Sequence, residues 1–360
     1  MPGLDIPVEL GAEFLHGEAR VTHSLLRRAG IATVESTRSQ RALQNGRLRP
    51  INAFAEAQRA MKGASLKRDV SFDDFLKGIE VSKKTKSFAR MMVQGFDAAD
   101  PRRVSARSIA EEWGEGGELG DSQPRPRGGY GALMDWLARR VPVRLQTRVQ
   151  RVAWKRGAVT VHARFIDQPF VVRARRAIVT LPLGVLQANA VRFSPSLGKT
   201  SVLKKLASGP VIRVAMRFSE AFWERRAPGV AFFHNPKAPF PTFWTPLPMR
   251  APLLTAWAGG PKAARLSGRT DLVQQAFASV KSVFRSPATL MDARVQDWRA
   301  DPFARGGYSY VLVGGEGARE ELAAPIGETI FLAGEATDSE EAGTVAGALR
   351  SGTRAARQAL

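Results

Sequence analysis

The sequence predicts an α/β protein with two domains, of which the second has mixed α+β character. The chain has 360 residues, more than a typical single domain contains. Its C-terminal segment reads as a strand, a glycine and a helix. Two separate stretches, 143–163 and 211–258, alternate apolar and polar residues as half-buried strands do. With 44% hydrophobic and 24% charged residues, the composition is that of a globular protein with a large core.

The composition also excludes several kinds of chemistry. The chain contains no cysteine, so disulfides, thiolate metal ligands and cysteine nucleophiles are ruled out. Its four histidines lie far apart in the sequence, and we expect no metal site. Apolar runs stay well short of the ~18 residues of a membrane span, and the first residues do not resemble a signal peptide. We therefore expect a cytoplasmic protein without a membrane span.

The formal net charge of +21 is large enough to attract nucleic acid or anionic membranes without specificity. The basic residues are nevertheless spread along most of the chain. Their densest groups are Arg102-Arg103, Arg139-Arg140, Lys155-Arg156 and the segment 173–176. The sequence contains no zinc-finger, ribonucleoprotein or basic-zipper pattern. This distribution favours a solvated basic surface, and we expect no specific nucleic-acid partner.

The C-terminal strand, turn and helix are the most informative part of the sequence. An apolar run from Ile330 ends at Gly334, and a helix rich in small residues begins near Gly343 after a polar loop. Free N–H groups and the helix dipole favour an anion at such a helix start. Small residues also allow a backbone or a flat ring to approach closely. The same pattern suits a helix packed tightly on a sheet, and physical reasoning alone leaves both interpretations open.

The chain upstream of this element begins with segments of different character. Residues 8–17 hold an apolar stretch between two glycines, which indicates either a strand turning over a ligand or an ordinary loop. Residues 20–112 are polar with helical spacing of apolar residues, and Ser71 followed by Asp74 predicts a helix N-cap. Residues 114–129 form a glycine- and proline-rich break. The glycines there do not match a dinucleotide-binding fingerprint, because Leu119 occupies the third glycine position.

Two sheet-forming regions follow this break. In the first, an amphipathic helix over 132–140 precedes three short alternating strands and a buried strand that Pro182 stops. In the second, strands near 211–218, 230–233 and 253–258 precede a helix over 271–284. The second pattern predicts the larger sheet of a separate domain.

Several segments resemble the flavin-containing amine oxidases, a family that includes monoamine oxidases, polyamine oxidases and histone lysine demethylases. These segments are Leu-Gly-Ala-x-x-x-His-Gly at 10–17, Thr-Leu-Pro-Leu-Gly-Val-Leu at 180–186, the Trp…Asp-Pro…Gly-x-Tyr-Ser element at 298–309, and Phe-Leu-Ala-Gly-Glu-Ala-Thr followed by Gly-Thr-Val-Ala-Gly-Ala-Leu-Arg-Ser-Gly at 331–352. The resemblance implies a Rossmann-like FAD/NAD(P)-binding domain joined to an amine-oxidase-type substrate domain. The implied FAD-binding domain is discontinuous and incomplete, with residues 1–20, 125–190 and 300–360, and the implied substrate domain has residues 21–124 and 191–299.

The resemblance also implies site residues. Arg213 stands where many members carry a lysine near flavin N5, unless it is simply a solvent-facing strand residue. Because arginine stays charged, Arg213 could hold a water there but could not act as a neutral base. Phe331 and Thr344 would form two walls of the substrate cage, with Tyr308 and Tyr310 as further candidates. Contacts to FAD are implied for Gly11, Ala12, Val149, Trp298, Gly334, Glu335, Thr344 and Val345.

The family's Gly-x-Gly-x-x-Gly strand, turn and helix is missing from the sequence, although it normally brings the backbone to the dinucleotide pyrophosphate. Two explanations are open. We favour a true start upstream of Met1, which would add about 40 to 60 residues for a βαβ unit and makes this an N-terminally truncated FAD domain. The alternative is a genuinely short chain that binds FAD weakly or not at all.

The leading functional hypothesis is FAD-dependent oxidation of a small-molecule amine, and it rests on the resemblance. Hydride transfer to flavin would give an imine that hydrolyses, and dioxygen would reoxidise the flavin to yield hydrogen peroxide. One alternative is a truncated non-catalytic fragment or pseudoenzyme of the same family. A related flavin desaturase and a basic nucleic-acid-associated protein are two others. The sequence leaves open the oligomeric state and whether the flavin is attached covalently.

Overall fold

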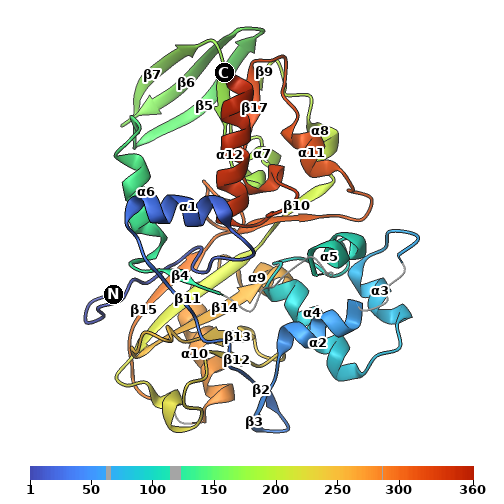
Figure 1. The fold of residues 1–360 in the computed structure, drawn as a ribbon, viewed down its shortest axis with the longest axis vertical. Coiled ribbons are helices and arrows are strands. Elements are labelled where there is room, and N and C mark those ends of the chain that lie inside the picture. Colours follow the sequence, from blue (N-terminus) through green and yellow to red (C-terminus); the bar gives the residue numbers. More distant parts are fainter. Residues whose placement is uncertain (62–65, 114–122, 286) are drawn as a thin grey trace.

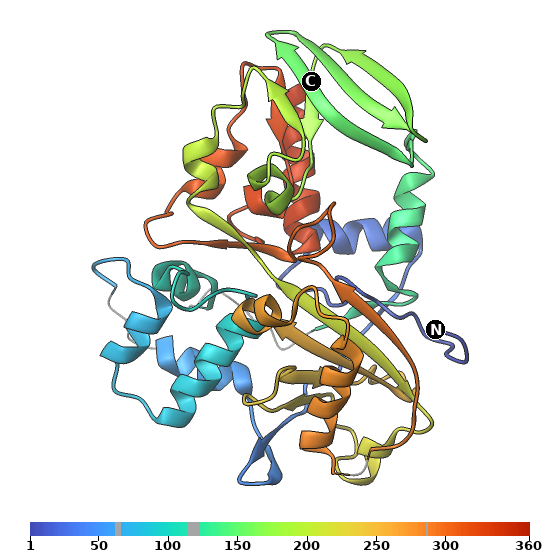
Figure 2. The same cartoon turned by 180° about the vertical axis from the view of Figure 1, so that it is seen from behind.

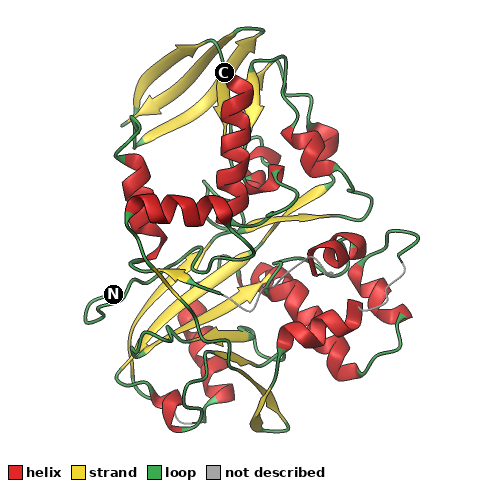
Figure 3. Ribbon diagram, viewed as in Figure 1, coloured by secondary structure: helices red, strands yellow, loops and turns green. Residues whose placement is uncertain are grey.

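The computed structural model describes residues 1–61, 66–113, 123–285 and 287–360. Figure 1 shows two parts, one above the other, joined by several extended segments. The mixture of helices and sheets, coloured in Figure 3, agrees with the predicted α/β class. Most of the glycine-rich break, 114–122, lies outside the described residues. Among the described residues, no helix is both long and apolar enough to cross a bilayer.

The lower part is built on a seven-stranded sheet with the order β15-β11-β14-β13-β12-β2-β3. Neighbouring strands are antiparallel except for β12 and β2, which run parallel. The strands are β2 (Gln40–Gln44), β3 (Arg47–Pro50), β11 (Val211–Phe218), β12 (Phe232–His234), β13 (Thr242–Trp244), β14 (Leu253–Gly259) and β15 (Leu290–Asp297). The α9 helix (Gly260–Leu266), the α10 helix (Leu272–Val283) and the short 3-10 helix η1 (Phe222–Arg225) accompany it.

Strand β11 lies inside this sheet and is buried on both faces. Its alternating sequence predicts one buried and one exposed face, yet the structure buries every residue from Val211 to Met216. Ile212, Val214 and Met216 belong to the core cluster that also contains residues of α10. Arg213 points the other way and lines a cavity, which explains why a charged residue is buried in a central strand.

Helices cover the other side of the lower part. They are α2 (Ala53–Met61), α3 (Phe72–Gly78), α4 (Lys83–Gly95) and α5 (Ala106–Trp113). The predicted N-cap of α3 is confirmed, because the Ser71 hydroxyl accepts a hydrogen bond from the Asp74 backbone N–H at 3.1 Å. Ser82 caps α4 in the same way through the Thr85 backbone N–H at 3.0 Å. These caps satisfy N–H groups that have no partner inside the helix.

The upper part contains a four-stranded sheet and a parallel strand pair (Figure 2). The sheet has the order β7-β6-β5-β9, with β5 (Thr147–Lys155), β6 (Ala158–Phe165), β7 (Gln168–Ala174) and β9 (Arg192–Ser194). The parallel pair is β8 (Ala177–Val179) and β17 (Ile330–Leu332). Around them lie α6 (Gly129–Ala138), α7 (Leu183–Gln187), α8 (Thr200–Leu203), α11 (Ala318–Ala323), the 3-10 helix η2 (Glu335–Thr337) and α12 (Val345–Ala359).

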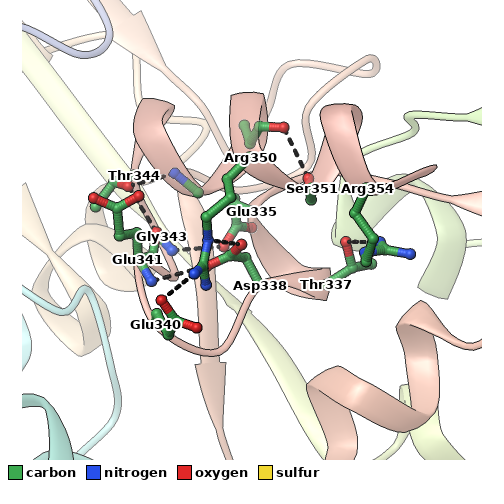
Figure 4. A network of polar contacts seen from close by, with 12 residues as sticks. Glu335, Thr337, Asp338, Glu340, Glu341, Gly343, Thr344, Arg350, Ser351 and Arg354 are labelled. Carbon is green, nitrogen blue, oxygen red and sulfur yellow. Dashed lines mark hydrogen bonds and ion pairs between the residues drawn. The ribbon is translucent and has the colours of Figure 1, made fainter. Parts of the chain in front are cut away.

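The C-terminal helix α12 packs tightly, as its small residues predict. A Cβ added to Gly347 would collide with the Glu341 carbonyl oxygen. The Ser351 hydroxyl accepts a hydrogen bond from the Gly334 backbone N–H at 2.9 Å and so ties the helix to the end of β17. Figure 4 shows Ser351 on α12 together with the polar contacts of the preceding loop.

Two antiparallel strand pairs and one helix complete the described elements. The pairs are β1 (Thr33–Val34) with β4 (Arg125–Pro126), and β10 (Leu206–Gly209) with β16 (Tyr308–Val311). The α1 helix (Arg20–Ala29) packs against α6 and α12 in the upper part. The domain boundaries expected from the sequence place residues 21–124, and therefore nearly all of α1, in the substrate domain. The structure differs here because the apolar face of α1, with Leu26, shares a core cluster with Leu133 of α6 and Ala346 of α12.

Candidate active site

A cavity of about 1330 Å³ lies where the two parts meet. Its wall combines the segment 11–21 near the chain start, the end of α4, strands of the seven-stranded sheet, and the beginning of α12. This volume exceeds the ~300–1,000 Å³ of pockets that hold drug-sized ligands. The cavity therefore has room for a large ligand together with a second molecule.

The cavity brings together most of the residues that the sequence singled out. The cavity is lined by Gly11, Ala12, Arg213, Trp298, Glu335, Thr344 and Val345. Tyr308 and Tyr310 line it as well. Gly334 lies directly before Glu335 and adopts a φ of 135°, in the region that favours glycine. Val149 and Phe331 are not among the lining residues.

The structure places Val149 and Phe331 in packing positions. Val149 lies in β5 next to a bulge and packs against the core cluster beneath that sheet. Phe331 is 2% exposed and clusters with Ala333 and Ala355 between β17 and α12. Side chains of successive strand residues point to opposite faces, and this alternation directs the Phe331 ring into the core. The side chain of Phe331 therefore does not form a wall of the cavity.

The loop at Gly11 is held against Trp298. The Trp298 indole Nε1 donates a hydrogen bond to the Leu10 carbonyl at 2.8 Å. A Cβ on Gly11 would lie 3.2 Å from a ring carbon of Trp298, closer than normal packing allows. Glycine at position 11 thus permits the loop to lie flat on the indole ring, and Gly11 and Ala12 border the cavity without bulk.

Arg213 is fixed in a buried ionic cluster that sequence reasoning missed. Its guanidinium forms an ion pair with Glu13 and donates a hydrogen bond to the Gly11 carbonyl at 2.9 Å. Arg125 pairs with the other Glu13 oxygen at 2.8 Å, and the Trp244 indole donates to Glu13 at 2.9 Å. Burial alone would raise the pKa of Glu13, but the charges of Arg213 and Arg125 hold that pKa below its usual value. Glu13 is therefore the anion that holds two buried cations in place.

Aromatic rings form much of the wall around this cluster. The Arg213 guanidinium lies 5.0 Å from the Trp244 ring centre, and the Trp244 and Trp257 rings are 5.7 Å apart. His16 stands edge-on to Phe96 at 5.3 Å. Burial lowers the pKa of His16 to about 4, with a further contribution from the Arg38 charge. Burial also lowers the pKa of His234 to about 4, so both imidazoles are neutral near pH 7.

A pair of carboxyl groups occupies another stretch of the cavity wall. Asp97 follows α4 and is 6% exposed, and Glu112 comes from α5. Burial and the neighbouring Glu112 charge raise the pKa of Asp97 well above its usual value. The pKa of Glu112 is also raised, although its side chain remains accessible from the cavity. Two neighbouring carboxyl groups resist ionising together, which makes the pair receptive to a cation.

Glu335 stabilises the loop before α12 through hydrogen bonds to its carboxylate. Its carboxylate accepts a hydrogen bond from the Ser309 hydroxyl at 2.7 Å. It accepts another from the Gly343 backbone N–H at 3.0 Å (Figure 4). Thr344 caps α12 by accepting from the Gly347 backbone N–H at 3.0 Å. Arg350 pairs with Asp338 at 2.7 Å. These contacts fix the start of α12 at the edge of the cavity.

Three functional candidates escaped the sequence reasoning: Glu13, Asp97 and Glu112. Glu13 stands two residues after Gly11, inside a segment that the sequence did single out. Asp97 and Glu112 belong to a long helical region with many charged residues, and nothing in its pattern separates them from the others. Among the described residues, no group of histidine, aspartate and glutamate side chains could hold a metal ion.

Comparison with known proteins places the chain in a family. The family model for flavin containing amine oxidoreductase matches residues 2–360. Human lysine-specific histone demethylase 2 is 30% identical over 242 residues, which cover 63% of this chain and 29% of that protein. Polyamine oxidase 4 of rice (Oryza sativa subsp. japonica) is 29% identical over 269 residues, covering 73% and 54%. The chain thus spans about a third to a half of the length of these two relatives.

Solved structures share the fold. A putrescine oxidase variant superposes with a TM-score of 0.79 at 19% identity, over 98% of this chain and 88% of that one. The cyclohexylamine oxidase from Brevibacterium oxydans gives 0.78 at 19% identity, over the same shares of the two chains. The family model matches nearly every residue, and the architecture agrees with enzymes that oxidise amines. The chain therefore belongs to the flavin-containing amine oxidoreductase family.

Proposed function

We propose that this chain oxidises an amine with FAD as cofactor and dioxygen as the final electron acceptor. The observation that carries the proposal is the cavity of about 1330 Å³, which joins the Gly11 loop, the start of α12, an aromatic wall and a carboxyl pair. Family membership supports the reaction class, and the residues in the wall support the kind of substrate.

The lining residues fit a flavin. Gly11 and Ala12 on one side, and Thr344 and Val345 on the other, border the cavity with little bulk, as a flat ring system requires. The N-terminus of α12 turns its free N–H groups and positive dipole end toward an anion. We propose these residues as flavin contacts, together with Trp298, whose ring supports the Gly11 loop. Gly334 and Glu335 would act indirectly, by shaping the turn before α12.

When bound, the flavin supplies a hydride acceptor that dioxygen can reoxidise with release of hydrogen peroxide. The chain's own residues bind and orient the amine. Trp244, Trp257 and Phe14 supply apolar surface that excludes water around the reacting carbon. His16 and His234 stay neutral near pH 7 and add no positive charge beside the amine. Arg213 acts as a positioning residue, because its donors are engaged by Glu13 and by the Gly11 carbonyl.

The carboxyl pair supports a substrate with a second cationic group. Asp97 and Glu112 both lie in the wall with raised pKa values, and the negative charge of the buried Asp97 is poorly solvated. An ammonium group entering beside them would favour the ionised form of a carboxyl and gain a charge-assisted hydrogen bond. One of the solved structures that shares this fold is a putrescine oxidase bound to putrescine. We therefore propose a diamine or polyamine as the substrate.

The first test is an absorbance spectrum of the purified protein, followed by peroxide detection with amines. We expect flavin bands and turnover of 1,4-diaminobutane. The kcat/KM for this diamine should exceed that for 1-aminobutane by about tenfold or more, since each tenfold needs ~1.4 kcal/mol of differential binding. A colourless protein would favour the non-catalytic alternative. A yellow protein that releases no peroxide with any amine would contradict amine oxidation.

Matched variants test the carboxyl pair separately from the reaction. Asp97→Asn and Glu112→Gln should lower kcat/KM for the diamine and leave the value for 1-aminobutane nearly unchanged. Glu111→Gln serves as the control, because Glu111 neighbours Glu112 on the same helix but is not among the residues that line the cavity. Equal losses for both amines in the two wall variants would refute the diamine proposal while leaving amine oxidation intact.

A further inference from the structure

The four-stranded sheet of the upper part has two unlike faces. One face packs on the core through residues such as Val152, Val159 and Phe193. The register of the strands places a different set on the opposite face. A bulge between Val149 and Arg151 keeps the cations of β5 on this same side. The basic residues of this outer face, all exposed, are Arg148, Arg151, Lys155, Arg164, Arg173 and Arg192.

Several of these cations stand directly opposite one another. Arg148 is the register partner of Arg164, and Arg151 is the register partner of Arg192. Arg148 and Arg164 belong to antiparallel strands, where opposite Cβ atoms lie about 4.5–5.5 Å apart. Arg151 and Arg192 belong to parallel strands, which lie ~4.8 Å apart, and like charges at these distances repel. The sheet therefore holds positive charges close together at some cost to its own stability. A bound polyanion would turn that repulsion into attraction.

Acidic residues do little to neutralise this face. None of the four strands contains an aspartate or a glutamate. Asp167, in the turn after β6, lies 3.7 Å from the Arg164 guanidinium. Glu328 pairs with Arg156, which follows the end of β5. Both carboxylates sit at the margin of the sheet, so its centre remains strongly positive.

We propose that this outer face, named here the basic sheet face, binds the phosphate backbone of double-stranded nucleic acid without sequence preference. Five of its six cations are arginines, whose planar forks match phosphate oxygens. Neighbouring strands lie ~4.8 Å apart and alternate residues of a strand ~6.6 Å apart, which forms a compact grid of donors. The face lies on a different part of the molecule from the cavity, so the proposal is independent of the proposed enzymatic activity.

The chemistry of the face favours a duplex over other anionic partners. The aromatic residues of these strands, Trp154, Phe165, Phe170 and Phe193, belong to the opposite face by register. Single strands are usually held by several bases stacked on aromatic rings, and the four described strands place no such ring on the basic sheet face. One exposed ring from outside the strands, Phe303, lies 6.0 Å from the Arg148 guanidinium at the edge of the face. Membrane-surface binding relies on several inserted aromatic or leucine side chains, whereas the strands contribute Val171 to this face and Phe303 lies at its edge. Backbone phosphates of a duplex need only positioned cations.

The test measures binding of the full chain to a short fluorescent DNA duplex by anisotropy, from ~50 to ~200 mM salt. The variant Arg151→Gln/Arg173→Gln/Arg192→Gln neutralises the centre of the face. We expect weaker binding, and a slope of log Kd against log salt that falls by about one unit per arginine removed. The variant Arg151→Lys/Arg173→Lys/Arg192→Lys keeps the three positive charges and should therefore keep most of the slope. Single Arg151→Gln should lower it by about one unit, which provides the test if the triple variant fails to fold.

The matched control removes the same charge elsewhere. Arg226→Gln/Arg265→Gln/Arg285→Gln changes three exposed arginines of the lower part and should leave the slope nearly unchanged. Equal weakening by both triple variants would mean that net charge alone drives binding, and would overturn the proposal. Binding to vesicles that contain phosphatidylserine without binding to the duplex would overturn it in favour of a membrane surface. Failure to bind the duplex at ~50 mM salt would also overturn it.

Discussion

The acidic groups of the cavity wall and the cations of the basic sheet face differ in the sign of their charge and in how that charge is solvated. The wall holds Glu13, Asp97 and Glu112, each of which has a shifted pKa. The sheet face gathers its cations in solvent, where screening weakens each one. A buried charge is costly and needs a specific partner, whereas an exposed charge costs little and acts together with its neighbours. The comparison predicts large effects for single changes in the wall and small ones on the sheet.

The largest effect is expected at the helix start that borders the cavity. Ala348 lines the cavity, and Ala348→Trp should fill the space proposed for the flavin. Flavin binding should be abolished, because the indole ring would occupy the space that the flavin ring system needs. Absorbance of the purified variant measures the occupancy. Ala356→Trp, at an exposed position of the same helix, is the control and should keep its colour. An Ala348→Trp protein with the same flavin absorbance as wild type would contradict the proposed flavin placement.

A comparably large loss of stability is expected at Glu13. Glu13→Gln removes the anion between Arg213 and Arg125 and leaves both buried cations with backbone carbonyl partners but without the carboxylate that pairs with them. Removal of one partner from a buried ion pair costs about 3–5 kcal/mol. Urea denaturation measures the loss. The control is Glu18→Gln, whose exposed pair with Arg20 should contribute little because solvent screens it.

The pH dependence of that loss has a defined sign. The pKa of Glu13 is lowered in the folded protein, so its stabilising contribution is present above the ordinary carboxyl pKa. The contribution is lost as pH falls through the folded-state pKa. The difference in stability between wild type and Glu13→Gln should therefore shrink in acid. A difference that stays constant down to strongly acidic pH would contradict this role.

Asp97 should behave in the opposite way. Its pKa is raised in the folded protein, so the associated stability is present at acidic pH and lost as pH rises through the folded-state pKa. Asp97→Asn should therefore stabilise the ligand-free protein at neutral pH by about 1 kcal/mol or more, because a tenfold change in proton affinity corresponds to ~1.4 kcal/mol. The gain should vanish in acid, where the carboxyl is protonated in both the folded and the unfolded chain. Thermal unfolding at several pH values measures it, and a variant less stable than wild type at neutral pH would count against a poorly solvated carboxyl.

The smallest effect is expected on the basic sheet face. Arg192→Thr removes one member of the Arg151 and Arg192 cross-strand pair and should stabilise the free protein by about 0.2–1 kcal/mol at low salt. The gain should disappear at ~1 M salt, where the Debye length is about 3 Å. Urea denaturation at the two salt concentrations checks it. Arg226→Thr, which is exposed in the lower part, is the control. A gain that does not depend on salt would point to strand propensity and not to charge repulsion.

Sequence reasoning recovered the residues at the ends of strands and the starts of helices. The family resemblance implied Gly11, Thr344 and Val345 as site residues, and the structure places them together in one cavity wall. Phe331 was assigned to the same wall, but its position along β17 turns the ring into the core. In a short strand, the face on which a given side chain lies depends on the elements that pack against the strand. The local sequence does not contain this information.

For the charged groups, too, some properties follow from the sequence and others only from the tertiary structure. The composition determined the net charge of +21 and the absence of thiol chemistry, and the alternation of apolar and polar residues predicted two sheet-forming regions. Family motifs indicated a flavin-dependent amine oxidoreductase. Tertiary structure alone decided that Glu13 meets Arg213, that Asp97 meets Glu112, and that scattered arginines share one sheet face. The physical reason is that composition, caps and turns are properties of local sequence, whereas electrostatic interaction depends on distances that strand register and packing create between residues far apart in the chain.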